Sequence, residues 1–167
     1  MSLVDDISTL QKIPMLSNFG DDQLRLLAFS AETLEFRDGM RLFDEGDRAD
    51  GGLVIANGRV SMQQRVNDDY TEVDVAEEGT LLGETAMLVD TKRPCRAIAI
   101  DHVRVIRIRR ALFKRMMQEY PELARGLFEQ HAARYQRTAN AIGPIGQRLQ
   151  RMENELENQR SRAPKDA

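Results

Sequence analysis

Apolar residues near the start of the chain recur at helical intervals. The repeating positions are Leu10, Ile13, Leu16 and Phe19. This spacing predicts N-terminal helices over residues 8–29. Gly20 interrupts the pattern, and Asp21 or Asp22 behind it is a candidate N-cap for a second helix, because a carboxylate accepts hydrogen bonds from unpaired amides.

From residue 31 the helical period is lost, and short apolar pieces alternate with glycine turns as far as residue 109. Many short strands at a spacing of about eight to twelve residues indicate a closed or double-sheet β architecture rather than βαβ units. Asn57-Gly58 is predicted to be the turn of a hairpin, because both residue types tolerate positive φ. Asn67-Asp68-Asp69 is predicted to form another hairpin tip.

The helical pattern returns after Arg109 and predicts C-terminal helices over residues 110–141, one of them starting at Pro121. Residues 145–160 form a further predicted helix with an apolar seam. The seam consists of Ile145, Leu149, Met152 and Leu156. It fits either a coiled coil that joins two copies in a homodimer or a solvated amphipathic helix, and both interpretations stay open. Residues 161–167 are expected to be a disordered tail.

Composition narrows the function classes. The 167 residues are 41% hydrophobic and 31% charged, which fits one domain with a modest appendage. A net charge of -3 argues against a dominant nucleic-acid role. The sequence suggests no membrane span and no signal peptide, and with the single cysteine Cys95 a reducing cytoplasm is the expected location. His102 and His131 lie far apart, so neither a metal site nor histidine-based catalysis is expected.

The segment Leu81-Leu82-Gly83-Glu84-Thr85-Ala86-Met87, with Arg93-Pro94-Cys95 after it, carries the candidate chemistry. A glycine turn that opens a helix leaves amides without backbone partners, and such amides bind anions. We therefore expect unpaired amides at Gly83, Thr85 and Ala86. Glu84 would accept from a sugar hydroxyl, and Arg93 would hold a phosphate oxygen. This combination suits a cyclic nucleotide, whereas the plainer alternative is a surface salt bridge between Glu84 and Arg93.

The order of elements and the motifs resemble the cyclic nucleotide-binding domain family of catabolite-activator-type regulators, cyclic-nucleotide-dependent kinases and cyclic-nucleotide-gated channels. The resemblance extends from about Ile13 to Tyr135. Beyond the candidate segment it covers residues 39–47, 50–60, 79–84 and 103–110, and then Pro121-Glu122-Leu123-Ala124. It implies a mainly β fold with flanking helices, a double-stranded β-helix of the jelly-roll type, with N-terminal helices and C-terminal hinge helices.

The resemblance also implies roles for single residues. Glu84 would accept from the ribose 2′-hydroxyl, Arg93 would pair with the exocyclic phosphate oxygen, and the backbone at Gly83, Thr85 and Ala86 would contact ribose and phosphate. The other implied pocket residues are Leu82, Pro94, Cys95 and, for the adenine amino group, Thr138 on the long helix. The family often has an adjacent serine where Ala139 stands, so the alternative for Thr138 is an ordinary exposed helix position.

Pro94 departs from the family pattern, in which a residue with an amide facing the phosphate follows the arginine. Proline has no N–H, and one lost phosphate contact costs about 1.5–3 kcal/mol. Weakened binding is therefore expected rather than none.

The resemblance implies a non-enzymatic regulator that binds cyclic AMP or cyclic GMP and acts on a protein partner. Two alternatives remain: a degenerate domain that binds no nucleotide and serves as an interaction module, or the sensor part of a truncated transcription regulator. DNA binding by this chain is not expected. A helix-turn-helix would have to follow the long helix, and only the predicted helix over residues 145–160 and the tail over residues 161–167 come after it. No cofactor is expected beyond the nucleotide ligand.

Overall fold

The computed structural model describes residues 2–130. The chain divides into two units, Met1–Ala124 and Arg125–Ala167, and each is taken by itself. The predictions for Thr138, for the helix over residues 145–160 and for the tail over residues 161–167 lie outside the described residues, as does the predicted end of the hinge helices at residue 141.

The N-terminal helical segment begins earlier than predicted and is divided by a proline. It consists of α1 (Leu3–Gln11), the 3₁₀ turn η1 (Pro14–Leu16) and α2 (Asp21–Ser30). The N-cap of α2 is Gly20, whose amide donates to the Gln23 side chain at 2.9 Å. The prediction of Asp21 or Asp22 as the cap is therefore wrong; both lie in the first helical turn, where a negative charge is also favourable.

Eight strands follow between residues 32 and 109, the part of the chain where the alternating pattern predicts strands. They are β1 (Glu32–Phe36), β2 (Arg41–Phe43), β3 (Arg48–Ala49), β4 (Gly51–Val66), β5 (Asp69–Ala76), β6 (Leu81–Leu82), β7 (Thr91–Lys92) and β8 (Arg96–Arg109). One sheet has the order β1-β8-β4-β5, with β2 on β8 and β6 on β4, and β3 pairs with β7 in a second sheet. All pairings are antiparallel. This confirms the mainly β class of fold with flanking helices.

The expected turn at Asn57-Gly58 is wrong. Strand β4 runs straight through these residues, and its pairing with β8 shifts register on both sides of Asn57. Gly58 has a φ of 92°, and a Cβ there would come 2.5 Å from the His102 carbonyl oxygen. The positive φ thus serves a bulge within a long strand, not a turn between two strands.

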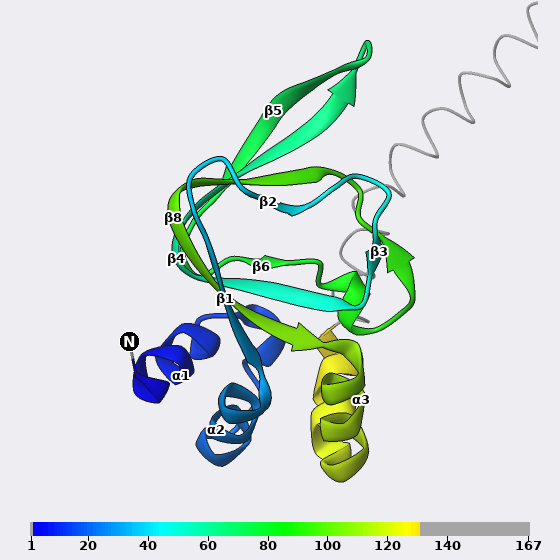
Figure 1. Ribbon diagram of the computed structural model, residues 1–167. Coiled ribbons are helices and arrows are strands. Elements are labelled where there is room, and N and C mark those ends of the chain that lie inside the picture. The colour runs from blue at the N-terminus through cyan, green and yellow to red at the C-terminus, as the bar shows by residue number, and fades with distance from the viewer. Residues whose placement is uncertain (1, 131–167) are drawn as a thin grey trace, which may run out of the picture. The chain divides into compact units, whose positions relative to one another are not determined.

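The second predicted hairpin tip is confirmed. Asn67 and Asp68 have φ values of 50° and 71° and connect β4 to β5. Asn and Asp tolerate this left-handed conformation better than most other residues. In Figure 1 the β4–β5 hairpin projects from the end of the β-roll opposite to the helices of the same unit.

Helix α3 (Arg110–Glu119) follows β8 directly and packs on the same end of the roll as the N-terminal helices (Figure 1). Its Phe113 is 1% exposed and stacks on Phe19, with ring centroids 6.2 Å apart. As predicted, a new helix starts at Pro121, and residues 121–130 are helical. Because α3 follows β8 without a linker, the end of β8 positions α3 so that Phe113 packs in this buried apolar contact.

An ion pair holds β2 against β8 and gives a pH prediction. The guanidinium of Arg96 donates to both carboxylate oxygens of Asp44, at 2.9 and 3.2 Å, and lowers the pKa of Asp44 to about 2. A lowered carboxyl pKa stabilises the fold above the unfolded value of about 3.9, and this contribution is lost as the pH falls through 2. Between pH 4 and pH 2 the urea midpoint of the wild type is expected to fall more steeply than that of Asp44→Asn. Parallel slopes for the two proteins would contradict this.

Candidate anion-binding site

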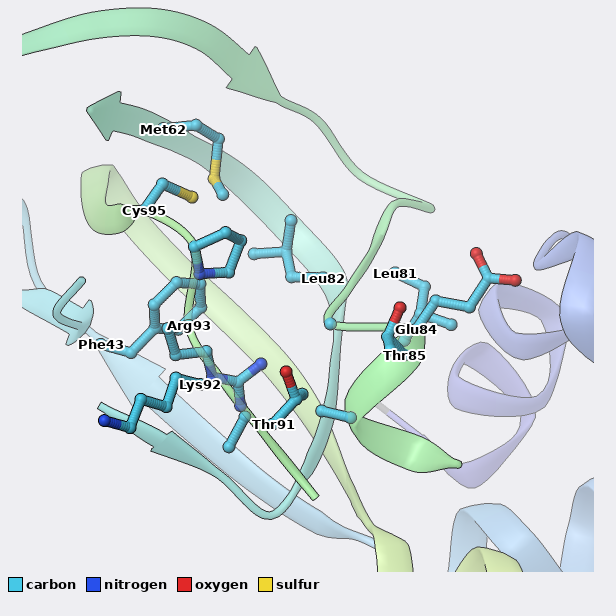
Figure 2. Close-up of a pocket in the computed structure, with 14 residues that line it drawn as sticks. Phe43, Met62, Leu81, Leu82, Glu84, Thr85, Thr91, Lys92, Arg93 and Cys95 are labelled. Atoms are coloured by element: carbon cyan, nitrogen blue, oxygen red, sulfur yellow. The ribbon is translucent and has the colours of Figure 1, made fainter. Parts of the chain in front are cut away.

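A cavity of about 490 Å³ opens between β4, β6, the segment after β6 and the segment around β7 (Figure 2). It is lined by Phe43, Ala49, Met62, Leu81, Leu82, Gly83, Glu84, Thr85, Ala86, Thr91, Lys92, Arg93, Pro94 and Cys95. This volume lies within the range of small-molecule sites. Every described residue that the sequence singled out for the site is in this lining; Thr138 lies outside the described residues.

Arg93 is the buried charge of the cavity. Its side chain is 8% exposed, and its Nη2 donates to the Gly51 carbonyl oxygen at 3.0 Å. The guanidinium carbon lies 4.5 Å from the centre of the Phe43 ring, in a cation–π arrangement. Its Nη1 is buried without a hydrogen-bond partner among the described residues. A buried donor without a partner costs free energy, and an anion in the cavity would remove that cost.

Burial lowers the pKa of the Arg93 guanidinium from its ordinary value, and the nearby Asp50 carboxylate opposes this shift. The pKa of arginine starts so high that the side chain stays charged at neutral pH. The cavity therefore contains a desolvated positive charge with a spare donor.

Gly83 allows the guanidinium to lie against the backbone. Its φ is 81°, and a Cβ at this position would come 2.2 Å from Arg93 Nη1 and 3.3 Å from the Gly51 carbonyl oxygen. Only glycine fits both demands, positive φ and close approach. The structure thus brings together the predicted turn and the predicted cation.

The turn after Gly83 is the 3₁₀ turn η2 (Thr85–Met87), and one of its amides contradicts the prediction. The Ala86 amide donates to the Gly83 carbonyl oxygen at 3.0 Å. The expectation of an unpaired amide at Ala86 is therefore wrong, because a 3₁₀ turn already pairs its residues three apart. Thr85 stands at the first position of the turn with an exposed side chain.

Glu84 belongs to the lining, but its carboxylate does not face Arg93. It is partly exposed, and in Figure 2 it points away from the Arg93 guanidinium. Since Arg93 is buried, a surface salt bridge between the two residues is not what holds that side chain. The acidic and the basic group of the cavity lining therefore lie apart.

The far side of the cavity is apolar. Met62, Leu82 and Cys95 lie there (Figure 2), and Leu82 and Cys95 are 7% and 8% exposed. Burial, with a smaller effect from the Glu45 carboxylate, raises the pKa of the Cys95 thiol, so the thiol is neutral at pH 7. Pro94 is exposed at the cavity wall and offers no N–H.

Two partners of Arg93, the Phe43 ring and the Gly51 carbonyl, are not predicted from the sequence. Phe43 reaches the site because β2 pairs with β8, and Gly51 because it starts β4 beside the second sheet. Neither position can be predicted from the spacing of residues in the chain, because both depend on how the strands are arranged and paired.

Residues 2–130 contain neither a membrane-spanning helix nor a cluster of metal ligands. No helix in this range is long and apolar enough to cross a membrane. No group of three or more His, Cys, Asp or Glu side chains in this range is placed to hold a metal ion.

Comparison with known proteins identifies the family. The family model described as the cyclic nucleotide-binding domain matches residues 33–120, which include the whole cavity lining.

Several solved structures share the fold. A cyclic nucleotide-binding-like protein from Brucella abortus is 36% identical, with 68% of this chain and 98% of that chain covered and a TM-score of 0.64. The N-terminal domain of a transcriptional regulator from Streptomyces coelicolor is 24% identical over 80% of this chain and 96% of that one, with a TM-score of 0.75. The regulatory domain of Toxoplasma gondii PKA, solved with cAMP, is 21% identical over 80% of this chain and 50% of that one, with a TM-score of 0.63.

Among curated proteins, lysophospholipase NTE1 of Yarrowia lipolytica is 25% identical over 143 residues, 74% of this chain. The match spans only 10% of that enzyme, and a second lysophospholipase NTE1, from Chaetomium globosum, is matched over 6% of its length. The likeness therefore concerns one domain within much longer proteins. By its fold, its cavity and the family model that matches more than half of it, the chain belongs to the cyclic nucleotide-binding domain family.

Proposed function

We propose that this domain binds a cyclic nucleotide, cyclic AMP or cyclic GMP, and acts as a non-enzymatic switch on a protein partner. One observation carries the proposal: the buried guanidinium of Arg93 holds a spare donor, Nη1, against the Gly83 turn inside a cavity of about 490 Å³. An anionic group there would gain a charge-assisted hydrogen bond that water does not screen.

The rest of the cavity supports the same ligand. Glu84 belongs to the cavity lining and would accept from a ribose hydroxyl, and the apolar wall around Leu82 and Cys95 suits the flat face of a base. Helix α3 contacts η2, so a ligand that rearranges the turn also acts on α3. A ligand shifts the balance between a free and a bound arrangement of the domain only through contacts that differ between the two arrangements. The hydrogen bond from Arg93 Nη1 to the ligand is one contact that only the bound arrangement has.

The direct test is a calorimetric titration of the full chain with cyclic AMP and with cyclic GMP. Linear 5′-AMP serves as a control for general phosphate binding. We expect saturable binding of at least one cyclic nucleotide, and a rise in Tm of about 5–10 °C at one hundred times its Kd. No heat and no shift in Tm at millimolar concentrations of both cyclic nucleotides would refute the proposal.

A second candidate function, an interaction module without nucleotide, rests on Pro94. This residue stands at the cavity wall directly after Arg93, where an N–H would otherwise face the anion. Because one such hydrogen bond to a charged group is worth about 1.5–3 kcal/mol, its absence weakens the site without removing Arg93.

Restoring the amide separates the two candidates. Pro94→Ala is expected to tighten cyclic nucleotide binding about tenfold or more, because it adds one donor beside Arg93. The matched control is Pro14→Ala at the start of η1, an exposed proline outside the cavity lining, which should leave the affinity unchanged. Binding that appears only in Pro94→Ala would favour the module without nucleotide. Equal affinities of Pro94→Ala and the wild type would show that residue 94 contributes no donor to the ligand.

A further inference from the structure

Arg110, the first residue of α3, contacts carbonyl groups at the C-terminal end of η2 and just after it. Arg110 Nη1 donates to the Val89 carbonyl oxygen at 2.8 Å and lies 3.4 Å from the Ala86 carbonyl oxygen. Its Nη2 lies 3.6 Å from the Asp90 carboxylate, and the Arg110 side chain is 17% exposed. One guanidinium therefore spans both the turn and the residues that follow it.

This arrangement satisfies groups that the turn cannot pair itself. The last carbonyls of any helical turn have no partner within it, and a cation near that end supplies donors of the right sign. Arg110 is not among the residues that line the cavity in the described part of the chain. It therefore supports η2 from the outside, while Gly83 and Thr85 at the other end of the turn face the cavity.

Arg110 also holds the strand segment that anchors Arg93. Its backbone amide donates to the Asp50 carbonyl oxygen at 2.7 Å, and its Nη1 lies 3.3 Å from the Ala49 carbonyl oxygen. The next carbonyl along the chain, that of Gly51, accepts from Arg93 Nη2. The two arginines thus act on one short stretch, residues 49–51, from the cavity side and from the α3 side.

We propose that Arg110 is a positioning residue for the anion site: it fixes η2 and residues 49–51 in one arrangement and ties that arrangement to the start of α3. As far as the ligand is concerned, this inference rests on the proposed function. The positioning itself is a property of the nucleotide-free protein and is testable without a ligand.

The experiment compares Arg110→Gln, Arg110→Lys and the matched control Arg115→Gln, which alters an exposed arginine one turn further along α3. Hydrogen exchange is measured in the nucleotide-free full chain at the amides of residues 86–89, which donate within the turn. Arg110→Gln is expected to speed their exchange about tenfold relative to the control, while the amides of β8 and of β4 beyond Gly52 keep their rates. Arg110→Lys, which keeps the charge and one donor toward Val89, is expected to lie between the wild type and Arg110→Gln.

The second readout is the affinity for cyclic AMP, which Arg110→Gln should weaken about tenfold and Arg110→Lys should largely restore. Unchanged exchange at residues 86–89 in Arg110→Gln would overturn the inference, and so would a uniform rise that includes β4 and β8, since that is general destabilisation. If the wild type binds no cyclic nucleotide, the proposed function fails, but the exchange measurement still decides the role of Arg110.

Discussion

Replacing Arg93 by methionine is expected to weaken cyclic nucleotide binding at least about thirtyfold without lowering the Tm of the free protein. Removing one partner of a desolvated, hydrogen-bonded charge pair costs about 2–5 kcal/mol of binding free energy, which sets the thirtyfold floor. The free protein loses the hydrogen bond from Nη2 to the Gly51 carbonyl oxygen, and this loss is offset because it also loses a charge that burial disfavours and a donor, Nη1, that has no partner among the described residues. Methionine keeps an unbranched apolar chain against the Phe43 ring, so the packing is largely retained.

The matched control for this substitution is Arg104→Met. Arg104 is 7% exposed, as buried as Arg93, but it pairs with Asp6 of α1 at 2.7 Å and lies outside the cavity lining. Arg104→Met should lower the Tm, because it leaves the Asp6 carboxylate half of a buried pair, and it should keep the affinity. The two variants are therefore expected to differ in opposite ways: Arg93→Met loses affinity and keeps its Tm, whereas Arg104→Met loses Tm and keeps its affinity. A Tm loss of several degrees together with lost binding in Arg93→Met would instead make Arg93 a structural residue.

Gly83→Ala is expected to weaken binding at least about tenfold and to destabilise the fold by about 1–2 kcal/mol. The backbone part follows from a φ of 81°, which an L-residue with a Cβ adopts at a cost of about 1–2 kcal/mol. The binding part follows from the 2.2 Å approach of that Cβ to Arg93 Nη1, because the guanidinium must leave the place where it would meet the anion. Affinity comes from calorimetry and stability from urea unfolding.

Gly39→Ala separates the loss of stability from the loss of affinity. Gly39 has a φ of 76°, but an added Cβ there would meet nothing within 4 Å. It should reproduce the loss of stability and leave the affinity unchanged. Equal affinities of Gly83→Ala and Gly39→Ala would mean that the approach of Arg93 to the turn has no part in binding.

Much of the fold could be predicted from the sequence. The helical spacing of apolar residues ends at residue 31 and returns after Arg109, and such a change of period distinguishes strands from helices. Asn57-Gly58 shows the limit. A hairpin turn and a bulge both need positive φ, so the dipeptide reports the backbone angle and not whether the chain reverses. Which of the two forms depends on β8, the strand that pairs on both sides of Gly58.

The candidate site divides in the same way. Gly83 and Arg93 could be paired from the sequence because a short segment joins them and their chemistry is complementary. The supports of the pair, Phe43, Gly51 and Arg110, come from strands and a helix remote in the chain, and only register and packing bring them there. The prediction for the Ala86 amide is wrong for a smaller reason: the chain forms a 3₁₀ turn here and not the start of an α-helix.

The most direct test of the central claim observes the Arg93 guanidinium itself, in an ¹⁵N–¹H NMR spectrum of its side chain during a titration with cyclic AMP. Arg93→Met assigns the signal, and cyclic GMP is titrated in parallel. We expect the Arg93 Nη1 resonance to shift saturably and its protons to exchange more slowly with water, since the orphaned donor then holds a phosphate oxygen. An Arg93 signal that stays unchanged while the protein saturates with nucleotide, or at millimolar nucleotide without saturation, would contradict the claim.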